Sequence, residues 1–182
     1  MSLDRLDHLL SLAPDVPGAF QSAEQRRTEL RADVFAVAKA NGGRFDLRAV
    51  QNRPSILRRV AGLLAETLPT GTDRLVCAQP DGIAVTTAIA LHTGLPFTTV
   101  AGGGDQGAHL DGEAHAGEHA VVIAPAVSTG LHAAQLVAAA QDSGLRVTHV
   151  LSILDRAGNG AAGEAVARKG AQLHALFTAD CP

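Results

Sequence analysis

Two patterns of hydrophobic and polar residues divide the chain near residue 70. Before this point, apolar residues recur at intervals of three and four, which is typical of amphipathic helices. The spacing predicts helices over 3–12, 22–39 and 54–68, and the Asn-Gly-Gly sequence at 41–43 is a typical stop for the second of them. We expect this helical part, residues 1–70, to cover the rest of the chain and not to form a separate domain.

From Arg74 onward, short apolar runs alternate with helical segments. The predicted strands are 74–79, 96–100, 119–125, 146–154 and 172–177, and the predicted helices lie near 82–93, 129–143 and 160–169. Such an alternation gives a parallel sheet with helices on both faces, and strands that are apolar on both sides suit burial between helices. The sequence therefore predicts an α/β fold, with 101–118 as its one long loop.

The composition restricts the classes of function. Of 182 residues, 46% are hydrophobic and 18% are charged, which excludes a disordered chain. Aromatic residues make up only 3% and the net charge is −3, so the chain lacks the stacking rings and the basic surface of nucleic-acid binders. No apolar stretch has the length of a membrane span, and the N-terminus does not resemble a signal peptide. The two cysteines, Cys77 and Cys181, form no disulfide framework. We expect a soluble, cytoplasmic protein without a nucleic-acid or membrane partner.

The most informative segment is an apolar strand at 121–123 that leads to Ser128-Thr129-Gly130 and then to a predicted helix from Leu131. Ligands of open parallel sheets bind beyond the carboxyl ends of the strands. A phosphate placed there would meet free backbone amides, the positive end of the helix dipole and two hydroxyl groups. A protonated His132 would add a cation. The alternative is an ordinary helix cap, with His132 on the helix surface.

Several further motifs follow one another along the chain. They are Phe45-Asp46-Leu47-Arg48, Asp81-Gly82-Ile83-Ala84, Gly94-Leu95-Pro96, the 121–130 segment, the strand at 146–156 that ends in Asp155-Arg156, and the strand at 170–178. In this order and spacing they resemble the type I phosphoribosyltransferases, closest to orotate phosphoribosyltransferase, over about residues 30–178. The resemblance implies a single domain over 1–182, with 1–70 contributing a small hood and 71–178 the core sheet.

The resemblance also implies roles for individual residues. The residues that match the phosphate-binding turn are Ser128, Thr129, Gly130, Leu131 and His132. Arg156 matches an arginine that contacts the carboxylate of orotate, and Ser128 lies on the same base-binding side. Asp81 and Gly82 fall in the turn that holds pyrophosphate, and Lys39 lies near a lysine of the hood. An active member would bind Mg²⁺ together with phosphoribosyl pyrophosphate (PRPP) and would form a dimer.

Where the chemistry should take place, the sequence departs from the family. Ala124-Pro125 replaces the acidic pair that holds the ribose hydroxyls, and neither side chain offers an acceptor. The loop that should deliver cations to the pyrophosphate, 101–107, contains no Lys or Arg. Asp81 stands where a glycine would let the backbone approach a phosphate. These changes remove ribose and pyrophosphate contacts while the phosphate turn is kept.

The distribution of charge along the sequence also disfavours transferase activity. No Lys or Arg lies between Arg74 and Arg146, and the six acidic residues there give a formal charge of −6. Because stabilisation of transition-state charge is usually the largest catalytic effect, these losses argue against ordinary turnover. We therefore expect a divergent relative that binds a phosphate-bearing ligand, a nucleotide or a phosphosugar, with weak or absent transferase activity. The alternative is an active orotate phosphoribosyltransferase of pyrimidine synthesis, either as a homodimer or with a partner subunit, such as an active paralogue, that supplies the missing cations.

A second alternative is metal binding through the segment 105–119. His109, His115 and His119 alternate there with acidic residues, and imidazole with carboxylate is a ligand set for zinc. A solvated polar loop explains the same residues, because Gly112 and Gly117 disfavour a stable helix across it.

Overall fold

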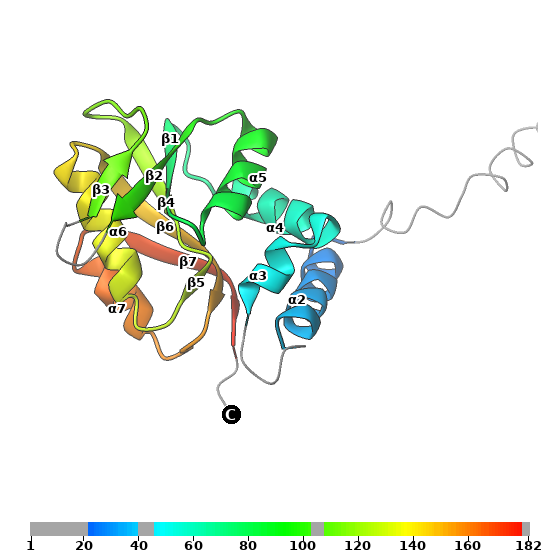
Figure 1. Ribbon diagram of the computed structural model, residues 1–182. Helices are drawn as coiled ribbons and strands as arrows, with labels where there is room; N and C mark the ends of the chain where they lie inside the picture. Colours follow the sequence, from blue (N-terminus) through cyan, green and yellow to red (C-terminus); the bar gives the residue numbers. More distant parts are fainter. Residues whose placement is uncertain (1–21, 40–45, 103–107, 180–182) are drawn as a thin grey trace, which may run out of the picture.

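The computed structural model describes residues 22–39, 46–102 and 108–179 (Figure 1). Its helices are α2 (Ala23–Lys39), α3 (Leu47–Gln51), α4 (Pro54–Glu66), α5 (Ile83–Thr93), α6 (Leu131–Asp142) and α7 (Ala161–Ala167). Its strands are β1 (Arg74–Ala78), β2 (Phe97–Gly102), β3 (Ala108–Asp111), β4 (His119–Ile123), β5 (Ala126–Val127), β6 (Arg146–Asp155) and β7 (Gln172–Thr178). The predicted helix over 3–12 and the turn at 41–43 lie outside the described residues.

The strands form one seven-stranded sheet. All neighbouring pairs are parallel except β2 with β3, which is antiparallel and lies at one edge. Strand β6 pairs first with β4 and then, at Leu154 and Asp155, with the two-residue β5. Because Leu154 also pairs with Phe177 of β7, strands β5 and β7 lie on opposite sides of β6. The carboxyl ends of β1, β4 and β6 therefore follow one another along a single edge of the sheet.

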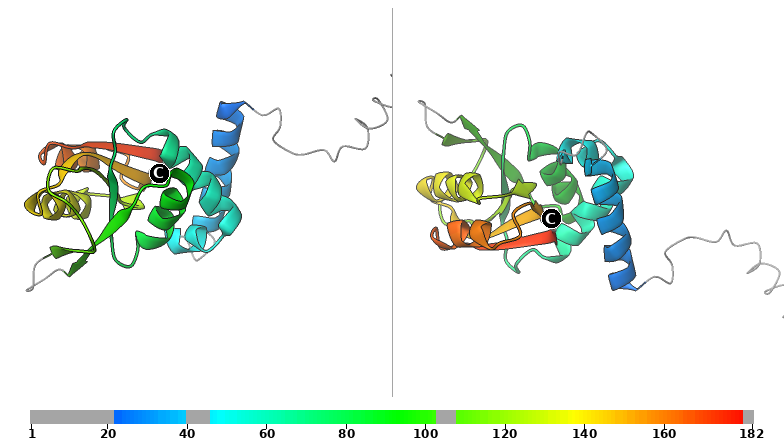
Figure 2. Two further views of the ribbon diagram at one scale, coloured as in Figure 1. Left: turned by 90° about the horizontal axis from the view of Figure 1, so that it is seen from above. Right: turned by 90° about the horizontal axis from the view of Figure 1, so that it is seen from below.

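Helices cover both faces of this sheet (Figure 2). On β1, Leu75 and Cys77 face a core that includes buried residues of α2, α4 and α5, whereas Val76 between them faces a core formed with α6 and α7. This alternation follows from the two-residue period of a strand. The N-terminal helices thus contribute to the same hydrophobic core as one face of the sheet. In the parts of the chain that the structure describes, no helix is long and apolar enough to cross a membrane.

Local sequence explains where several helices begin and end. Ser22 and Gln25 form a reciprocal capping box at the start of α2, with N···O distances of 2.9 and 3.1 Å. Pro54 occupies the first turn of α4, where its missing N–H costs no hydrogen bond. Gly94 ends α5 in the left-handed conformation, with its amide donating to the carbonyl of Ala90.

The predicted helices and strands that fall in the described residues are confirmed to within two residues at each end. The structure differs from the prediction at three places: one predicted loop is wrong, one strand is shorter, and one helix was not predicted. The segment 101–118 is not one long loop, because β2 extends to Gly102 and Ala108–Asp111 forms β3. The strand predicted to reach 125 ends at Ile123, because Pro125 has no N–H to continue the ladder. The short helix α3 was not expected, since five residues carry too little periodicity to be recognised.

Candidate functional site

A cavity of about 360 Å³ lies at the carboxyl ends of β1, β4 and β6. The polar side chains on its wall belong to Asp46, Arg48, Gln51, Asp81, His132 and Arg156. Ala124, Pro125 and Gly82 are among the other lining residues. The cavity is therefore bounded by the sheet edge, by α3 and by the start of α6, which is where a ligand of an open α/β sheet is expected.

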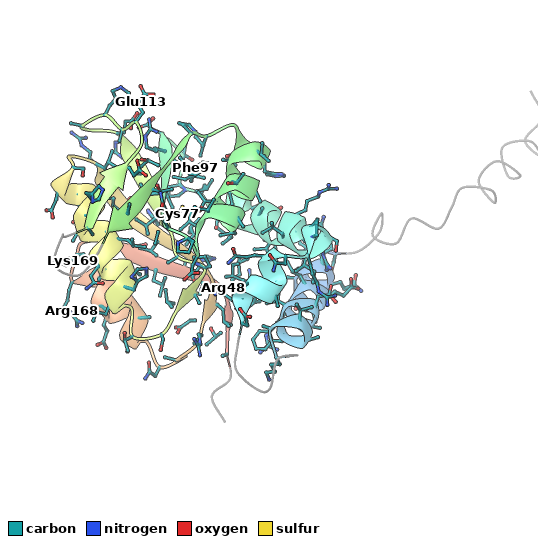
Figure 3. All side chains as sticks on the ribbon, in the orientation of Figure 1. Arg48, Cys77, Phe97, Glu113, Arg168 and Lys169 are labelled. Carbon is teal, nitrogen blue, oxygen red and sulfur yellow. The ribbon has the colours of Figure 1, made fainter. Side chains whose placement is uncertain are left out.

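Helix α3 brings a cation to this cavity. The Asp46 carboxylate accepts a hydrogen bond of 2.9 Å from the amide of Arg48 and so caps the helix. The guanidinium of Arg48 then reaches the Asp81 carboxylate, with Nη2 at 3.0 Å from Oδ1. Figure 3 shows Arg48 where the N-terminal helices meet the sheet. Asp46 and Arg48 belong to a motif of the sequence, but neither they nor Gln51 were expected in the site.

The strand end at Ala124-Pro125 forms the floor of the cavity without a charged group. The Ala124 amide donates to the Leu151 carbonyl over 2.9 Å, and the Pro125 carbonyl accepts from the amides of Ile153 and Leu154. Ala124 is 3% exposed, so its methyl group packs into the core. The Pro125 carbonyl also accepts from the Ser152 hydroxyl over 3.3 Å, and the side chains of Ala124 and Pro125 contribute no acceptor to the cavity.

The turn at Ser128–Gly130 leaves backbone donors free. Within the described residues, the amides of Ser128, Thr129 and Gly130 donate to no backbone or side-chain acceptor, and both hydroxyl-bearing residues are exposed. The Leu131 amide makes only a long contact of 3.4 Å to the Thr129 hydroxyl. Three consecutive unpaired amides before the 12-residue helix α6 are the arrangement that anions occupy.

Gly130 fixes the shape of this turn. It begins α6 with φ of +72°, a left-handed conformation that side chains disfavour. A Cβ atom there would lie 2.5 Å from the carbonyl oxygen of Ala162, which is too close for any other residue. The turn is therefore pressed against α7 and depends on glycine.

The predicted site residues are only partly brought together. Asp81, Gly82, Ala124, Pro125, His132 and Arg156 line the cavity. The four residues Ser128, Thr129, Gly130 and Leu131 lie beside it and not on its wall. Lys39 is the last residue of α2, stands 5.6 Å from the centre of the Phe35 ring, and is likewise not part of the wall.

Arg156 lies immediately after β6, with its amide bonded to the Val127 carbonyl over 2.8 Å. Its side chain is exposed and makes no ion pair with another described residue. The neighbouring Asp155 does not pair with it. The Asp155 carboxylate instead accepts from the amides of Ala157 and Gly158 and so holds the following loop. Arg156 is thus a cation on the cavity wall that is available to a ligand.

A second cavity of about 420 Å³ adjoins the first. Ala78, His132 and Leu136 line both cavities, which therefore adjoin beside α6 and the ends of β1 and β2. Gln79, on this second wall, donates to the Thr99 hydroxyl and to the Asp111 carboxylate. No Lys or Arg is among the described residues on its wall, so this part suits a neutral portion of a ligand better than a phosphate.

The histidines and acids near 105–119 do not gather around a common point in the described residues. His115 contacts Glu118 at 3.2 Å, and Glu118 also accepts a short hydrogen bond of 2.7 Å from the buried Arg74. The hydrogen bond from Arg74 is the main cause that lowers the pKa of Glu118 to about 2. Among the residues that the structure describes, no three His, Cys, Asp or Glu side chains form a group able to hold a metal ion.

The described wall of the cavity also lacks free carboxylates that could bind magnesium. Ala124 and Pro125 carry no carboxylate, the Asp81 carboxylate is paired with Arg48, and the Asp46 carboxylate is engaged by the Arg48 amide. Proteins typically bind Mg²⁺ through one or two carboxylates together with the phosphates of a substrate. The residues described here therefore do not fit a resident magnesium ion, which would have to arrive with a phosphorylated ligand.

No family model matches the chain. A phosphoribosyltransferase from Corynebacterium diphtheriae has a similar structure, with a TM-score of 0.73 and 21% identity over 84% of this chain and 95% of that one. Orotate phosphoribosyltransferase of Mycobacterium tuberculosis, in complex with inorganic phosphate, gives a TM-score of 0.68 and 24% identity over 84% and 95% of the two chains. The chain has the type I phosphoribosyltransferase fold.

Another protein of the same fold is more distant. Adenine phosphoribosyltransferase from Leishmania donovani aligns with 75% of this chain and 70% of its own length, at 17% identity and a TM-score of 0.62. The structural relatives thus include enzymes named for different bases. At these identities the likeness establishes the type I phosphoribosyltransferase fold and leaves the ligand to be argued from the site.

Proposed function

We propose that this protein binds a small phosphorylated ligand, a nucleotide or a phosphosugar, at the Ser128–Gly130 turn and Arg156, and that its transferase activity is weak or absent. The observation that carries the proposal is the row of three unpaired amides before α6, beside a cavity with an unpaired guanidinium. Backbone amides and a helix N-terminus suffice for a phosphate, whatever the rest of the site has lost. His132, on the same wall, adds positive charge when protonated.

The weak or absent transfer follows from what the cavity lacks. The side chains of Ala124 and Pro125 cannot accept hydrogen bonds from a ribose diol, and the acids on the described wall, Asp46 and Asp81, lie on the α3 and β1 side. Orotate phosphoribosyltransferase of Mycobacterium tuberculosis has been solved in complex with PRPP. Transfer from PRPP would here require magnesium and cations that the described wall does not supply beyond Arg48 and Arg156.

An active orotate phosphoribosyltransferase of pyrimidine synthesis is the second candidate function. The observation that favours it is that Arg156 stands unpaired on the wall, where it is free to contact a carboxylate. In that case Mg²⁺ would enter with PRPP, and a second subunit of a homodimer, or an active paralogue in a heteromer, would add the missing cations. We place either form in the cytoplasm.

Calorimetric titration of the full chain tests the phosphate site. We expect inorganic phosphate and ribose 5-phosphate to bind in the millimolar range, and Arg156→Gln to weaken both at least tenfold. Arg146→Gln is the matched control, because Arg146 is also exposed but lies at the opposite end of β6. Equal affinities in the two variants would contradict the role of Arg156, and no binding to the unmodified protein would contradict the proposal.

Turnover separates the two candidate functions. We expect the purified protein to form little or no orotidine monophosphate from orotate, PRPP and magnesium. A rate in the ordinary enzyme range of about 1–10³ s⁻¹ would establish the active transferase instead.

A further inference from the structure

Arg48 and Asp81 form an ion pair that ties α3 to the turn between β1 and α5. The Arg48 Nη2 and Nε atoms both donate to Oδ1 of Asp81, over 3.0 and 3.3 Å. Gln51, one helical turn further on, donates to the backbone carbonyl of Asp81 over 3.1 Å. One short helix therefore holds both the charge and the backbone of this turn.

The pair is poorly placed to stabilise the fold. The two side chains are 72% and 61% exposed, and exposed ion pairs typically contribute less than about 1 kcal/mol. Both residues, however, line the first cavity. The position of the pair thus bears on what enters the cavity more than on the stability of the chain.

Charge is distributed unevenly along the cavity. At the β1 end, the described wall carries the carboxylates of Asp46 and Asp81 and the guanidinium of Arg48, which is paired with Asp81. At the β6 end, Arg156 stands without an acid on the wall, since Asp155 is used by the loop that follows. One strand, β4, lies between β1 and β6, so the two ends are about 10 Å apart at the ordinary strand spacing. His132, also on this wall, adds positive charge only when protonated.

We infer that the Arg48–Asp81 pair restricts the cavity to ligands with a single phosphate group. The inference rests on the proposed function, which places that phosphate at the Ser128–Gly130 turn. A diphosphate at the β1 end would meet the carboxylate of Asp81, and Arg48, the one arginine of that end among the residues that the structure describes, is already paired with it. The ligand class is therefore a sugar monophosphate or nucleoside monophosphate whose remaining part is uncharged.

Titration with two ligands that differ only in the diphosphate tests this inference. Ribose 5-phosphate and PRPP are titrated into the full chain, each with EDTA and with Mg²⁺. We expect the unmodified protein to bind PRPP no more than threefold more tightly than ribose 5-phosphate. Asp81→Asn keeps the size and the acceptor for Arg48 while removing the charge, and should strengthen PRPP binding at least tenfold, about 1.4 kcal/mol, with ribose 5-phosphate unchanged within twofold.

Two further variants make the result specific. Arg48→Gln leaves Asp81 without its cation and should weaken PRPP binding, again with ribose 5-phosphate unchanged within twofold. Glu113→Gln removes the same charge from an acid that is 82% exposed and absent from the cavity wall, and should leave both affinities unchanged. Figure 3 shows Glu113 well away from Arg48.

Each contrary result has a distinct meaning. Binding of PRPP a hundredfold tighter than ribose 5-phosphate by the unmodified protein would overturn the inference and leave the phosphate site standing. If PRPP binds tightly only with Mg²⁺, and this binding is lost in Asp81→Asn, then Asp81 is a ligand of the metal. That result would also overturn the inference. Failure of ribose 5-phosphate to bind any variant would remove the proposed function itself, and the inference with it.

Discussion

The two ends of the parallel strands use their polar groups in different ways. At the amino ends of β1 and β4, the buried Arg74 is held by two hydrogen bonds to Glu118, and the Asp73 carboxylate accepts from the His119 amide. At the carboxyl ends, the Arg156 side chain and the amides of 128–130 have no partner in the described residues. The difference teaches that Arg74 has a structural partner at the amino edge, whereas Arg156 is available to a ligand at the carboxyl edge.

The carboxyl edge itself contains two contrasting turns. Both lead from a strand to a helix through a glycine, Gly82 before α5 and Gly130 before α6. In the first, the Gly82 amide donates to the Ala78 carbonyl and the Asp81 charge is paired with Arg48. In the second, the amides before the helix remain free. The same strand-glycine-helix plan thus gives one turn closed on itself and one open to an anion.

The largest expected effect lies at the amino edge. Arg74→Gln should lower the free energy of unfolding by about 3 kcal/mol, because removing one member of a buried pair leaves the other charge uncompensated. Arg156→Gln should change stability by less than about 0.5 kcal/mol, as an exposed substitution does. Urea unfolding of both variants measures the contrast. Equal losses would show that the two edges do not differ in this way.

Gly130→Ala is expected to have the next largest effect. The substitution forces a side chain into a left-handed conformation and towards the Ala162 carbonyl, so the free energy of unfolding should fall by about 1–3 kcal/mol and phosphate binding should be lost. Gly163→Ala in α7 is the control, because nothing lies within 4 Å of its Cβ position and alanine favours a helix. Retention of phosphate binding in Gly130→Ala would show that the turn is not the anion site.

A new acceptor at the strand end should improve ribose binding. Pro125→Asp places a carboxylate on the cavity wall, and a hydrogen bond to a charged group is worth about 1.5–3 kcal/mol. We expect ribose 5-phosphate to bind at least tenfold more tightly, with inorganic phosphate unchanged or weaker. Calorimetry with both ligands checks this. If the unmodified protein already prefers ribose 5-phosphate a hundredfold, other residues hold the ribose.

The pH dependence of stability provides the smallest and most specific effect. Because pairing with Arg74 lowers the pKa of Glu118 to about 2 from its usual value of 4.5, the charged form stabilises the fold above pH 4.5. This contribution should be lost as the pH falls from about 4.5 to 2. Unfolding measured at pH 7, 4 and 3 should therefore show the wild type approaching Glu118→Gln on acidification. A constant difference between the two proteins would contradict the role of the Arg74–Glu118 pair.

Local pattern sufficed for most of the fold. Periodicity locates these elements, because it depends on residues close together in the chain. Examples are the apolar runs of β1 and β6 and the three-and-four spacing of α4. Strand β3 was missed because Ala108–Asp111 is short and mostly exposed, and only pairing with β2 makes it a strand. Pro125 marks the end of a strand in the sequence, yet the predicted strand includes it.

The sequence by itself determined the strand–helix alternation, the Ser128-Thr129-Gly130 turn and the absence of acids at Ala124-Pro125, since each depends on residues close together in the chain. Only the tertiary structure decided that Arg48 pairs with Asp81, 33 residues away, and that Arg74 pairs with Glu118, 44 residues away. Composition counts a charge but does not show its partner, because pairing depends on which elements the sheet order brings together. In this protein that order leaves Arg156 unpaired on the cavity wall and Arg48 already engaged.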